Sequence, residues 1–568
     1  MTRKICPKIS YFVILRPNIG NMPPIPHFDK HKSVNIKKYL PIVLISATSI
    51  SAMAWNVGTE PTSKSVVIEE FTGIHCGNCP DGHKRATMLH HAHPEDIYLV
   101  SIHAGTFAEP SRSEPNYITE AGKAIHDYFE INSYPCGTTS RRDAGKGLVQ
   151  GRGDWGASAR TITRETSPVN LWAGCEYDAA TRKLDVTVEG YFTGEMSDPR
   201  LTVEILQDNI LGPQSGGLLG NEYPHRHVLR MMLNEDAFGE PLEFPGIGEY
   251  ISKSWSVELP ADVDGVTLTD SDIEILAFIS EGPGEIMKAA ACFPTIDADK
   301  AATRIIVQSD PLIAVGNNYA LGYAEVYLDN YSCETLTEAK FEVMINGNVE
   351  EMTWNGSIPA HGCGLVKVPF PQGWESIIDN DDNSLSVKML TANGRPAALE
   401  TFAIKSNFSK VSEYPSELTV KITTDTDAAD NTYRIIDSEG ETVAEFGPYP
   451  DGSQTAYEEH VSLEAGKVYG FEVTDAWGDG IYHPRGSVKF YKPNGKIASQ
   501  LMEIDGYGLR TFFRTTDTSG ITGIESDEET AEYYDLTGRR LSEPGRGLTI
   551  KVTREGDGTL RSAQKEIR

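Results

Sequence analysis

Two cysteines, Cys76 and Cys79, are separated by two residues in the stretch EEFTGIHCGNCPDGH. This Cys-x-x-Cys spacing suits a redox-active dithiol, a clip for a metal ion or a structural disulfide. A run of strand-forming residues, SVVIEEF, precedes the pair, and a helical pattern opens beside Pro80. The backbone N–H groups at a helix N-terminus stabilise a thiolate and lower its pKa. We therefore expect Cys76 to be the attacking sulfur and Cys79 the resolving one.

The elements around the pair alternate between strand and helix. DIYLVSIH reads as a second strand and EAGKAIHDYFEI as a second helix. This alternation predicts an α/β sheet with helices on its faces. After Pro168 the pattern changes to short strands cut by turn residues, and it stays so to residue 516. We predict a multidomain chain in which an α/β domain is followed by all-β sandwiches.

The chain of 568 residues is long enough for roughly three to five domains. The predicted divisions are a signal peptide at 1–54, an α/β domain at 55–168, three β-sandwiches at 169–303, 304–408 and 409–516, a polar linker at 517–527 and a small strand-rich tail at 528–568.

The predicted signal peptide has the three parts of a secretory leader. Four lysines between residues 30 and 38 precede an apolar stretch from Tyr39 to Ile50, and Ala52-Met53-Ala54 is a small-x-small cleavage site. An apolar stretch of about a dozen residues is too short to span a bilayer, which needs roughly 20. The residues before Lys30 are unusual for a leader, so an internal start at Met22 is an alternative. The leader predicts an exported protein.

The net charge of −30 bears on the partners. Nucleic acid is excluded as a partner, because binding it requires a basic face that displaces counterions. An acidic surface suits an exported protein whose copies repel one another.

Export also predicts that most cysteines pair, because the compartment is oxidising. Cys175 and Cys292 lie near the two ends of one strand-rich segment, and Cys333 and Cys363 lie within the next. We take these two pairs as candidate structural disulfides, although sequence alone does not fix the connectivity. Cys136 is left over, either as a third thiol near the dithiol or as a small buried apolar residue.

A metal site is an alternative use of the dithiol, since six histidines crowd the same segment. Cysteine with histidine can hold zinc or copper. The HHAH cluster, however, lies at the far end of the predicted helix from Cys76. We therefore do not expect the histidines and the dithiol to share one ion. The six histidines are His75, His83, His90, His91, His93 and His103.

Residues 60–165 resemble the thioredoxin-like fold. Glu70 precedes Cys76 where thioredoxins keep a buried carboxylate that moves protons to the second cysteine, and the Tyr134-Pro135 pair in NSYPCGTTSRRD stands where they have a cis-proline that aligns the substrate. His75 and Asn78 replace the Trp and Pro of thioredoxin. A protonated His75 would favour the thiolate of its neighbour. The resemblance implies catalytic roles for Cys76, Cys79 and Glu70 and substrate-binding roles for Tyr134, Pro135 and His75.

Residues 66–300 together resemble the exported outer-membrane-protein family of Bacteroidetes that is named after a twenty-eight-kilodalton surface antigen. The matching stretches are EFTGIHCGNCPDG, SYPCGTTSRRD and YPHRHVLRMML. Downstream stretches resemble modules of proteins exported by the type nine secretion system. These modules are an Ig-like unit in 304–408, a jelly-roll-like unit in 409–516 and a sorting-domain-like tail. The resemblance implies an outer-membrane, cell-surface or extracellular location.

The stretch DAWGDGI in the third sandwich is similar to a calcium loop. Asp475 and Asp479 are oxygen ligands of the kind that calcium prefers, and a glycine between them permits a tight turn. The alternative is a plain Asp-Gly turn between strands. The sequence requires no other cofactor.

Two functions of different classes follow. The first is thiol–disulfide exchange with envelope or secreted proteins through a mixed disulfide at Cys76. The second is a redox-inactive surface adhesion or binding protein in which Cys76–Cys79 is a structural disulfide. The sequence does not decide between them.

Overall fold

The computed structural model describes residues 55–217, 220–296, 305–308, 314–315, 322–377, 383–396, 404–408, 412–452, 455–481, 486–502, 508–517, 530–534, 540–541, 548–554 and 560–567. The predicted leader and most of the predicted linker lie outside these residues. None of the helices in the described residues is long and apolar enough to cross a membrane.

The first segment, residues 66–163, is a small sheet with helices on both faces, as its strand and helix pattern predicts. Strand β1 pairs in parallel with β2 and antiparallel with β3, and β3 pairs with β4. The elements are β1 (Val66–Thr72), α1 (Cys79–Ala92), β2 (Ile97–His103), α2 (Glu120–Tyr128), β3 (Cys136–Thr139), β4 (Gln150–Gly151) and α3 (Trp155–Thr163).

The alternation of side chains along β1 explains why helices cover both faces. Val66 and Ile68 pack in one apolar cluster with residues of α1 and α3. Val67 and Phe71, which point the other way, pack in a second cluster with residues of α2. All seven residues of β1 are buried. The strand is therefore the centre of the segment, and it carries Glu69 and Glu70 inside the fold.

The next segment continues the same sheet. Strand β10 pairs in parallel with β2 through Val228 and Ser101, which joins both segments into one nine-stranded sheet of order β16-β15-β7-β10-β2-β1-β3-β4, with β11 beside β7. The added strands are β7 (Pro199–Gln207), β10 (Val228–Met232), β11 (Glu240–Pro241), β15 (Ile273–Glu281) and β16 (Ile286–Cys292). The predicted boundary at 168/169 thus marks a change in the strand pattern, while the sheet runs across it.

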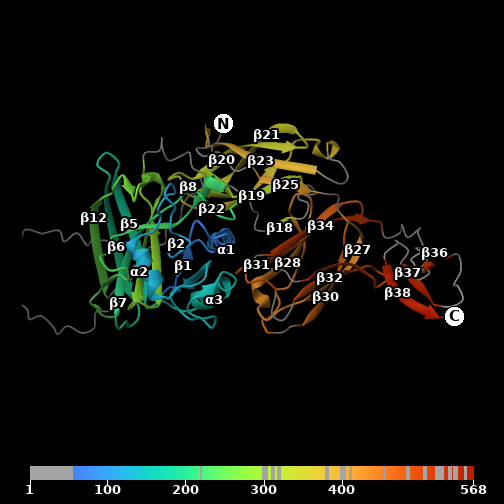
Figure 1. Ribbon diagram of the computed structural model, residues 1–568, viewed down its shortest axis with the longest axis horizontal. Coiled ribbons are helices and arrows are strands. Elements are labelled where there is room, and N and C mark those ends of the chain that lie inside the picture. Colours follow the sequence, from blue (N-terminus) through green and yellow to red (C-terminus); the bar gives the residue numbers. More distant parts are fainter. Residues whose placement is uncertain are drawn as a thin grey trace, which may run out of the picture. The chain divides into compact units, whose positions relative to one another are not determined.

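A three-stranded sheet covers β7 and β15 and makes this segment a sandwich. Its strands β5, β6 and β12 lie side by side in Figure 1, with β6 in the middle. Val186 and Val188 of β6 share an apolar core with Val203 of β7 and Ile275 of β15. The remaining elements are β5 (Val169–Asp178), β6 (Lys183–Phe192), β8 (Ile210–Gly212), a 3-10 turn (Gly220–Glu222), β9 (Tyr223–His225), β12 (Tyr250–Glu258), β13 (Asp262–Val263), β14 (Val266–Thr267) and a 3-10 turn (Asp270–Asp272).

The described residues between 305 and 408 contain two β-sheets and no α-helix, which agrees with the predicted all-β fold. One sheet has the order β17-β19-β22, and the other has β21-β20-β23-β24 with β25 beside β23. Val326 and Phe341 belong to the core between them. The strands are β17 (Ile305–Gln308), β19 (Tyr323–Asn330), β20 (Leu336–Ile345), β21 (Asn348–Ile358), β22 (Cys363–Pro369), β23 (Asn383–Ala392), β24 (Arg395–Pro396) and β25 (Ile404–Phe408), with a 3-10 turn at Trp374–Ser376.

The third all-β part pairs a six-stranded sheet with a four-stranded one, of orders β18-β34-β31-β28-β29 with β26 beside β34 and β30-β27-β32-β33. Strand β18 belongs here, although it precedes the predicted boundary. The strands are β18 (Ala314–Val315), β26 (Ser412–Pro415), β27 (Glu417–Thr423), β28 (Asn431–Ile436), β29 (Thr442–Phe446), β30 (Ala456–Ser462), β31 (Val468–Asp475), β32 (Ser487–Tyr491), β33 (Ile497–Met502) and β34 (Gly508–Thr516), with a 3-10 turn at Ala428–Asp430.

The tail forms a four-stranded antiparallel sheet of order β36-β35-β37-β38. Its strands are β35 (Thr530–Tyr534), β36 (Arg540–Leu541), β37 (Leu548–Arg554) and β38 (Leu560–Ile567). A sorting role for this sheet stays a prediction.

Candidate functional site

The dithiol lies directly before the first turn of α1. Cys76 and Cys79 are joined by a disulfide, with their Cα atoms 5.4 Å apart. The helix begins at Cys79, and the side chain of the capping residue Asn78 makes no hydrogen bond to its backbone. The helix N-terminus therefore stays available to stabilise a thiolate. Cys76 is 3% exposed and Cys79 is fully buried.

Glu70 is a buried carboxylate on the α1 side of β1. It is 3% exposed, and its Oε1 atom has no hydrogen-bond partner among the described residues. Burial raises the pKa of Glu70 well above its usual value, and the positive charges of Arg152 and His227 offset only part of this rise. Glu70 can therefore hold a proton at a pH where an exposed glutamate has lost it.

Gly82 brings α1 close to Glu70. A Cβ atom at this position would lie 2.5 Å from Glu70 Oε1 and 2.8 Å from Pro135 Cβ, so that any larger residue would collide with both. The Tyr134–Pro135 peptide bond is cis, the isomer that the thioredoxin resemblance implies. The structure thus brings the helix that starts at the dithiol together with Glu70 and Pro135.

His83, one turn into α1, links Glu70 to the next segment. Its Nε2 atom lies 3.8 Å from Glu70 Oε1 and 2.8 Å from the hydroxyl of Thr72. Its Nδ1 atom is 2.8 Å from the hydroxyl of Tyr223. Burial, together with the nearby His225, lowers the pKa of His83 to about 3. The ring is therefore neutral, and it donates one hydrogen bond and accepts the other.

A loop between β8 and β9 braces the backbone of the dithiol. The side-chain amide of Gln214 donates to the carbonyl of Cys76 at 2.9 Å, and the backbone N–H of Ser215 donates to the carbonyl of Ile74 at 2.8 Å. At Gly216, where φ is +76°, a Cβ atom would run into the carbonyl of Gly77. The second segment thus contributes directly to the site.

The other predicted substrate-binding residues lie near this centre but have partners of their own. Nε2 of His75 is 3.1 Å from a carboxylate oxygen of Glu114, and the side chain of His75 is 39% exposed. The hydroxyl of Tyr134 lies 2.6 Å from Nε2 of His126. His75 is therefore the residue of the predicted set that solvent reaches most readily.

The other cysteines of the described residues are not joined by a disulfide in the structure. Cys136 is buried, and burial raises the pKa of its thiol to about 11, which suits the apolar role. Cys175 and Cys292 contact one another through their thiols, so their pairing stays a prediction. Cys333 instead donates to the carbonyl of Ile296 at 3.3 Å. The thiol of Cys363 lies instead near His91 and Asp329.

The predicted calcium ligands lie in a tight turn. The carboxylate of Asp475 accepts hydrogen bonds from the backbone N–H groups of Trp477, Gly478 and Gly480 at 2.7 to 2.9 Å. Asp479 lies 3.6 Å from the guanidinium of Arg160. These contacts are those of an Asp-Gly turn, and calcium binding stays a prediction.

Asp208, His227 and Glu274 form a second group of ligand-type side chains, whose ligand atoms lie within 4.8 Å of one another. Nδ1 of His227 lies 3.0 Å from a carboxylate oxygen of Glu274. Burial alone would lower the pKa of His227, but the two carboxylates outweigh it and raise the pKa to about 9. An imidazolium therefore already neutralises much of this group's negative charge.

Several of these contacts could not have been found by sequence reasoning. His83 and Tyr223 are 140 residues apart, and Gln214 lies 138 residues after Cys76. Only the YPHRH stretch, which contains Tyr223, was part of a recognised pattern. No local signal marks Gln214.

Residues 122–287 match the family model described as outer membrane protein Omp28. The chain is related to this family. The match begins within α2 and ends within β16, and so it contains much of the shared sheet but not the dithiol or Glu70. The relation confirms the predicted family and gives the protein an outer-membrane or cell-surface location.

Solved structures show further likenesses. HBP35 of Porphyromonas gingivalis is 20% identical with a TM-score of 0.34, over 61% of this chain and 99% of that one. A domain of the outer membrane lipoprotein Omp28 from the same organism is 21% identical with a TM-score of 0.16, over 22% of this chain and 90% of that one. SGBP-B from the mixed-linkage glucan utilization locus of Bacteroides ovatus is 10% identical with a TM-score of 0.13, over 69% and 84%. Scores this low carry no argument about function. No curated protein matches the sequence.

Proposed function

We propose that the protein exchanges thiols and disulfides with envelope or secreted proteins, and that residues 55–168 are a thioredoxin-like domain. The observation that carries the proposal is the proton-holding carboxyl of Glu70 beside the helix that begins at Cys79. A carboxyl with a raised pKa, placed against the first turn of the helix that begins at the dithiol, suits general acid–base catalysis of disulfide exchange.

The Cys76–Cys79 disulfide accepts two electrons from a substrate dithiol in two exchange steps. A substrate thiolate attacks the sulfur of Cys76, a new S–S bond forms, and the bond to Cys79 breaks. Cys79 leaves as a thiolate and takes a proton from Glu70. A second substrate thiolate then attacks the substrate sulfur of the mixed disulfide and releases Cys76 as a thiolate, which the helix N-terminus stabilises. The reverse sequence reduces a substrate disulfide.

Substrate positioning falls to residues near Cys76. Tyr134 and Pro135 follow the thioredoxin resemblance and would align the substrate backbone. His75 stands next to Cys76 at the exposed edge of the site, where its side chain can meet an approaching substrate.

Burial of the dithiol favours the second function, a redox-inactive surface binding protein. Cys76 and Cys79 are 3% and 0% exposed, and the Gln214 loop holds the carbonyl of Cys76. A disulfide enclosed in this way is protected from attack, as structural disulfides are. Under this alternative the β-sandwiches carry the binding function.

A trapping experiment on residues 55–568 separates the two functions. In Cys79→Ser, Cys76 can attack the disulfide of a model peptide, but no resolving thiol follows. We expect a mixed disulfide at Cys76 that forms faster than adducts at Cys175 or Cys333, read by mass spectrometry. Cys76→Ser should form none at the fully buried Cys79. A Cys79→Ser chain that reacts no faster at Cys76 than at those two thiols would support the binding function instead.

A further inference from the structure

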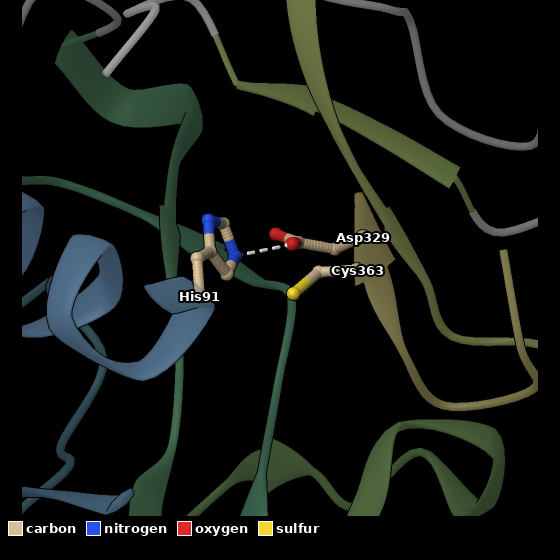
Figure 2. Close-up of side chains that lie close together, drawn as sticks. All are labelled: His91, Asp329 and Cys363. Atoms are coloured by element: carbon tan, nitrogen blue, oxygen red, sulfur yellow. Dashed lines mark ion pairs between the residues drawn. The ribbon is translucent and has the colours of Figure 1, made fainter. Parts of the chain in front are cut away.

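Three side chains of different chemistry meet away from the dithiol. Figure 2 shows His91, in the last turn of α1, facing Asp329 and Cys363 on neighbouring strands. Asp329 of β19 and Cys363 of β22 are register partners, so their side chains lie on the same face of the sheet. One ligand atom of each residue lies within 4.8 Å of the other two. The donors are an imidazole nitrogen, a carboxylate oxygen and a sulfur.

The group is enclosed and its carboxylate is oriented. The side chain of His91 is 2% exposed and that of Asp329 is 9% exposed, while Cys363 is half-buried. Arg226 donates to Oδ2 of Asp329 at 2.9 Å, and Oδ1 lies 2.5 Å from Nε2 of His91. Outer-shell partners of this kind fix the ligands of metal sites. The same contact orients Oδ1 toward the imidazole.

A plain ion pair accounts for His91 and Asp329 but not for the sulfur. An ion pair gains little from a thiol, whereas zinc binds imidazole, carboxylate and thiolate together. Magnesium and calcium prefer oxygen ligands alone, so the donor set disfavours both. Three protein ligands would leave a fourth position of a zinc tetrahedron for water or another ligand.

We propose that His91, Asp329 and Cys363 bind a zinc ion that links the last turn of α1 to strands β19 and β22. The cysteine loses its proton on binding, so affinity rises with pH. The site contains neither Cys76 nor Cys79, so it is separate from the metal site at the dithiol that the sequence raises as an alternative. The inference does not rest on disulfide exchange.

Cobalt reports on this site directly. We would strip residues 55–568 of metal with a chelator, keep the Cys76–Cys79 disulfide intact by omitting reductant, and titrate with Co²⁺. The expected result is one equivalent bound, with a thiolate-to-cobalt charge-transfer band and the strong visible bands of four-coordinate cobalt, and stoichiometric displacement by Zn²⁺. Absence of a thiolate band would overturn the proposal.

Variants identify the ligands. Cys363→Ser should abolish the thiolate band, and His91→Gln and Asp329→Asn should each weaken binding by at least about ten- to a hundredfold, since even outer-shell partners have effects of that size. Cys175→Ser, Cys333→Ser and His93→Gln are matched controls that should keep the wild-type band. A band that persists in Cys363→Ser, or disappears in either cysteine control, would overturn the assignment.

Two further measurements guard against misfolding and against binding at the dithiol. Far-ultraviolet circular dichroism and an intact Cys76–Cys79 disulfide check the fold of each variant. The double variant Cys76→Ser, Cys79→Ser should bind cobalt with the wild-type band, and loss of the band there would overturn the site. If Cys363→Ser does not fold, protection of Cys363 from alkylation by Zn²⁺ in the wild-type chain decides, with Cys333 as the unprotected control.

Discussion

Glu69 and Glu70 are neighbours on β1, both are buried, and they lie in opposite environments. Glu69 accepts hydrogen bonds from Nε and Nη2 of Arg141 at 2.8 and 2.5 Å and from the hydroxyl of Thr138 at 2.8 Å. Oε1 of Glu70 has no hydrogen-bond partner in the described part of the chain. Successive side chains of a strand point to opposite faces of the sheet. The carboxylate of Glu69 is therefore paired with Arg141, whereas that of the next residue, Glu70, lies on the other face without such a pair.

The difference teaches what each face of the sheet does. On the Glu69 face the guanidinium of Arg141 is fully buried and also lies over the rings of Phe238 and Phe278, at 5.2 and 5.4 Å from their centroids. On that face Glu69 and Arg141 form a buried ion pair that stabilises the fold, although Nη1 of Arg141 has no hydrogen-bond partner among the described residues. On the Glu70 face an incompletely satisfied carboxyl lies against the helix of the dithiol. One face of β1 thus carries an ion pair that stabilises the fold, and the other carries the carboxyl that we propose takes part in disulfide exchange.

The largest effect should come from breaking the paired side. Glu69→Gln removes the carboxylate that forms the ion pair with the buried guanidinium of Arg141, and we expect a loss of about 3–5 kcal/mol in local stability at neutral pH. Hydrogen exchange of β1 and β3 peptides, followed by mass spectrometry, measures the change. The control is Glu70→Gln, the same substitution one residue on, which should not lower protection. Equal losses of protection in the two variants would contradict the proposed difference between Glu69 and Glu70.

Glu70→Gln should instead slow the chemistry. We expect the rate of thiol–disulfide exchange to fall by about a hundredfold, the usual scale of a general acid–base group. Because the folded-state pKa of Glu70 is raised, its stabilising contribution is full below the ordinary pKa and is lost as pH rises through the raised value. The variant should therefore match wild-type stability at acidic pH and exceed it at neutral pH. A rate that does not change would remove Glu70 from the mechanism.

A Gly82→Ala substitution should disturb the Glu70 face alone. The added Cβ would press on Glu70 and Pro135, and overpacking of this kind costs about 1–3 kcal/mol. Gly77→Ala, in the dithiol loop, has no atom within 4 Å of its added Cβ and is the matched control. Hydrogen exchange of α1 should rise in the first variant and stay unchanged in the second. A similar rise in both would mean that the close approach at Gly82 is not tight.

The smallest expected effect tests the link to the second segment. Tyr223→Phe removes the hydrogen bond to Nδ1 of His83 and should reduce local stability by about 1 kcal/mol. The buried hydroxyl of Tyr117 has no hydrogen-bond partner among the described residues, so Tyr117→Phe should be close to neutral. Hydrogen exchange of α1 peptides compares the two. If both variants behave alike, the His83–Tyr223 contact contributes nothing to the site.

The local parts of the site could be predicted from the sequence. The strand before Cys76 and the helix beside Pro80 follow from residue patterns, and the thioredoxin resemblance pointed to Glu70 and Tyr134-Pro135. The long-range parts could not. Arg141 meets Glu69 across 72 residues, and a stretch containing two arginines does not show which one becomes buried.

The pairing of strands in the nine-stranded sheet could likewise be predicted only in part. The alternating pattern of β1 and β2 predicts strands with two buried faces, but nothing local says that β10 pairs with β2. In the sheet that this pairing joins, the β8–β9 loop brings Gln214 to the carbonyl of Cys76, and β9 brings Tyr223 to His83. His91 likewise meets partners more than 200 residues away in the sequence.

The reduction potential of Cys76–Cys79 tests the central claim most directly. Residues 55–568 would be equilibrated in glutathione buffers, the thiols alkylated, and the oxidised fraction of Cys76 and Cys79 read by mass spectrometry. A working dithiol predicts a midpoint between about −120 and −230 mV, the range of known oxidants and exchange catalysts. A midpoint below about −300 mV, where structural disulfides lie, would contradict exchange and assign the function to the β-sandwiches.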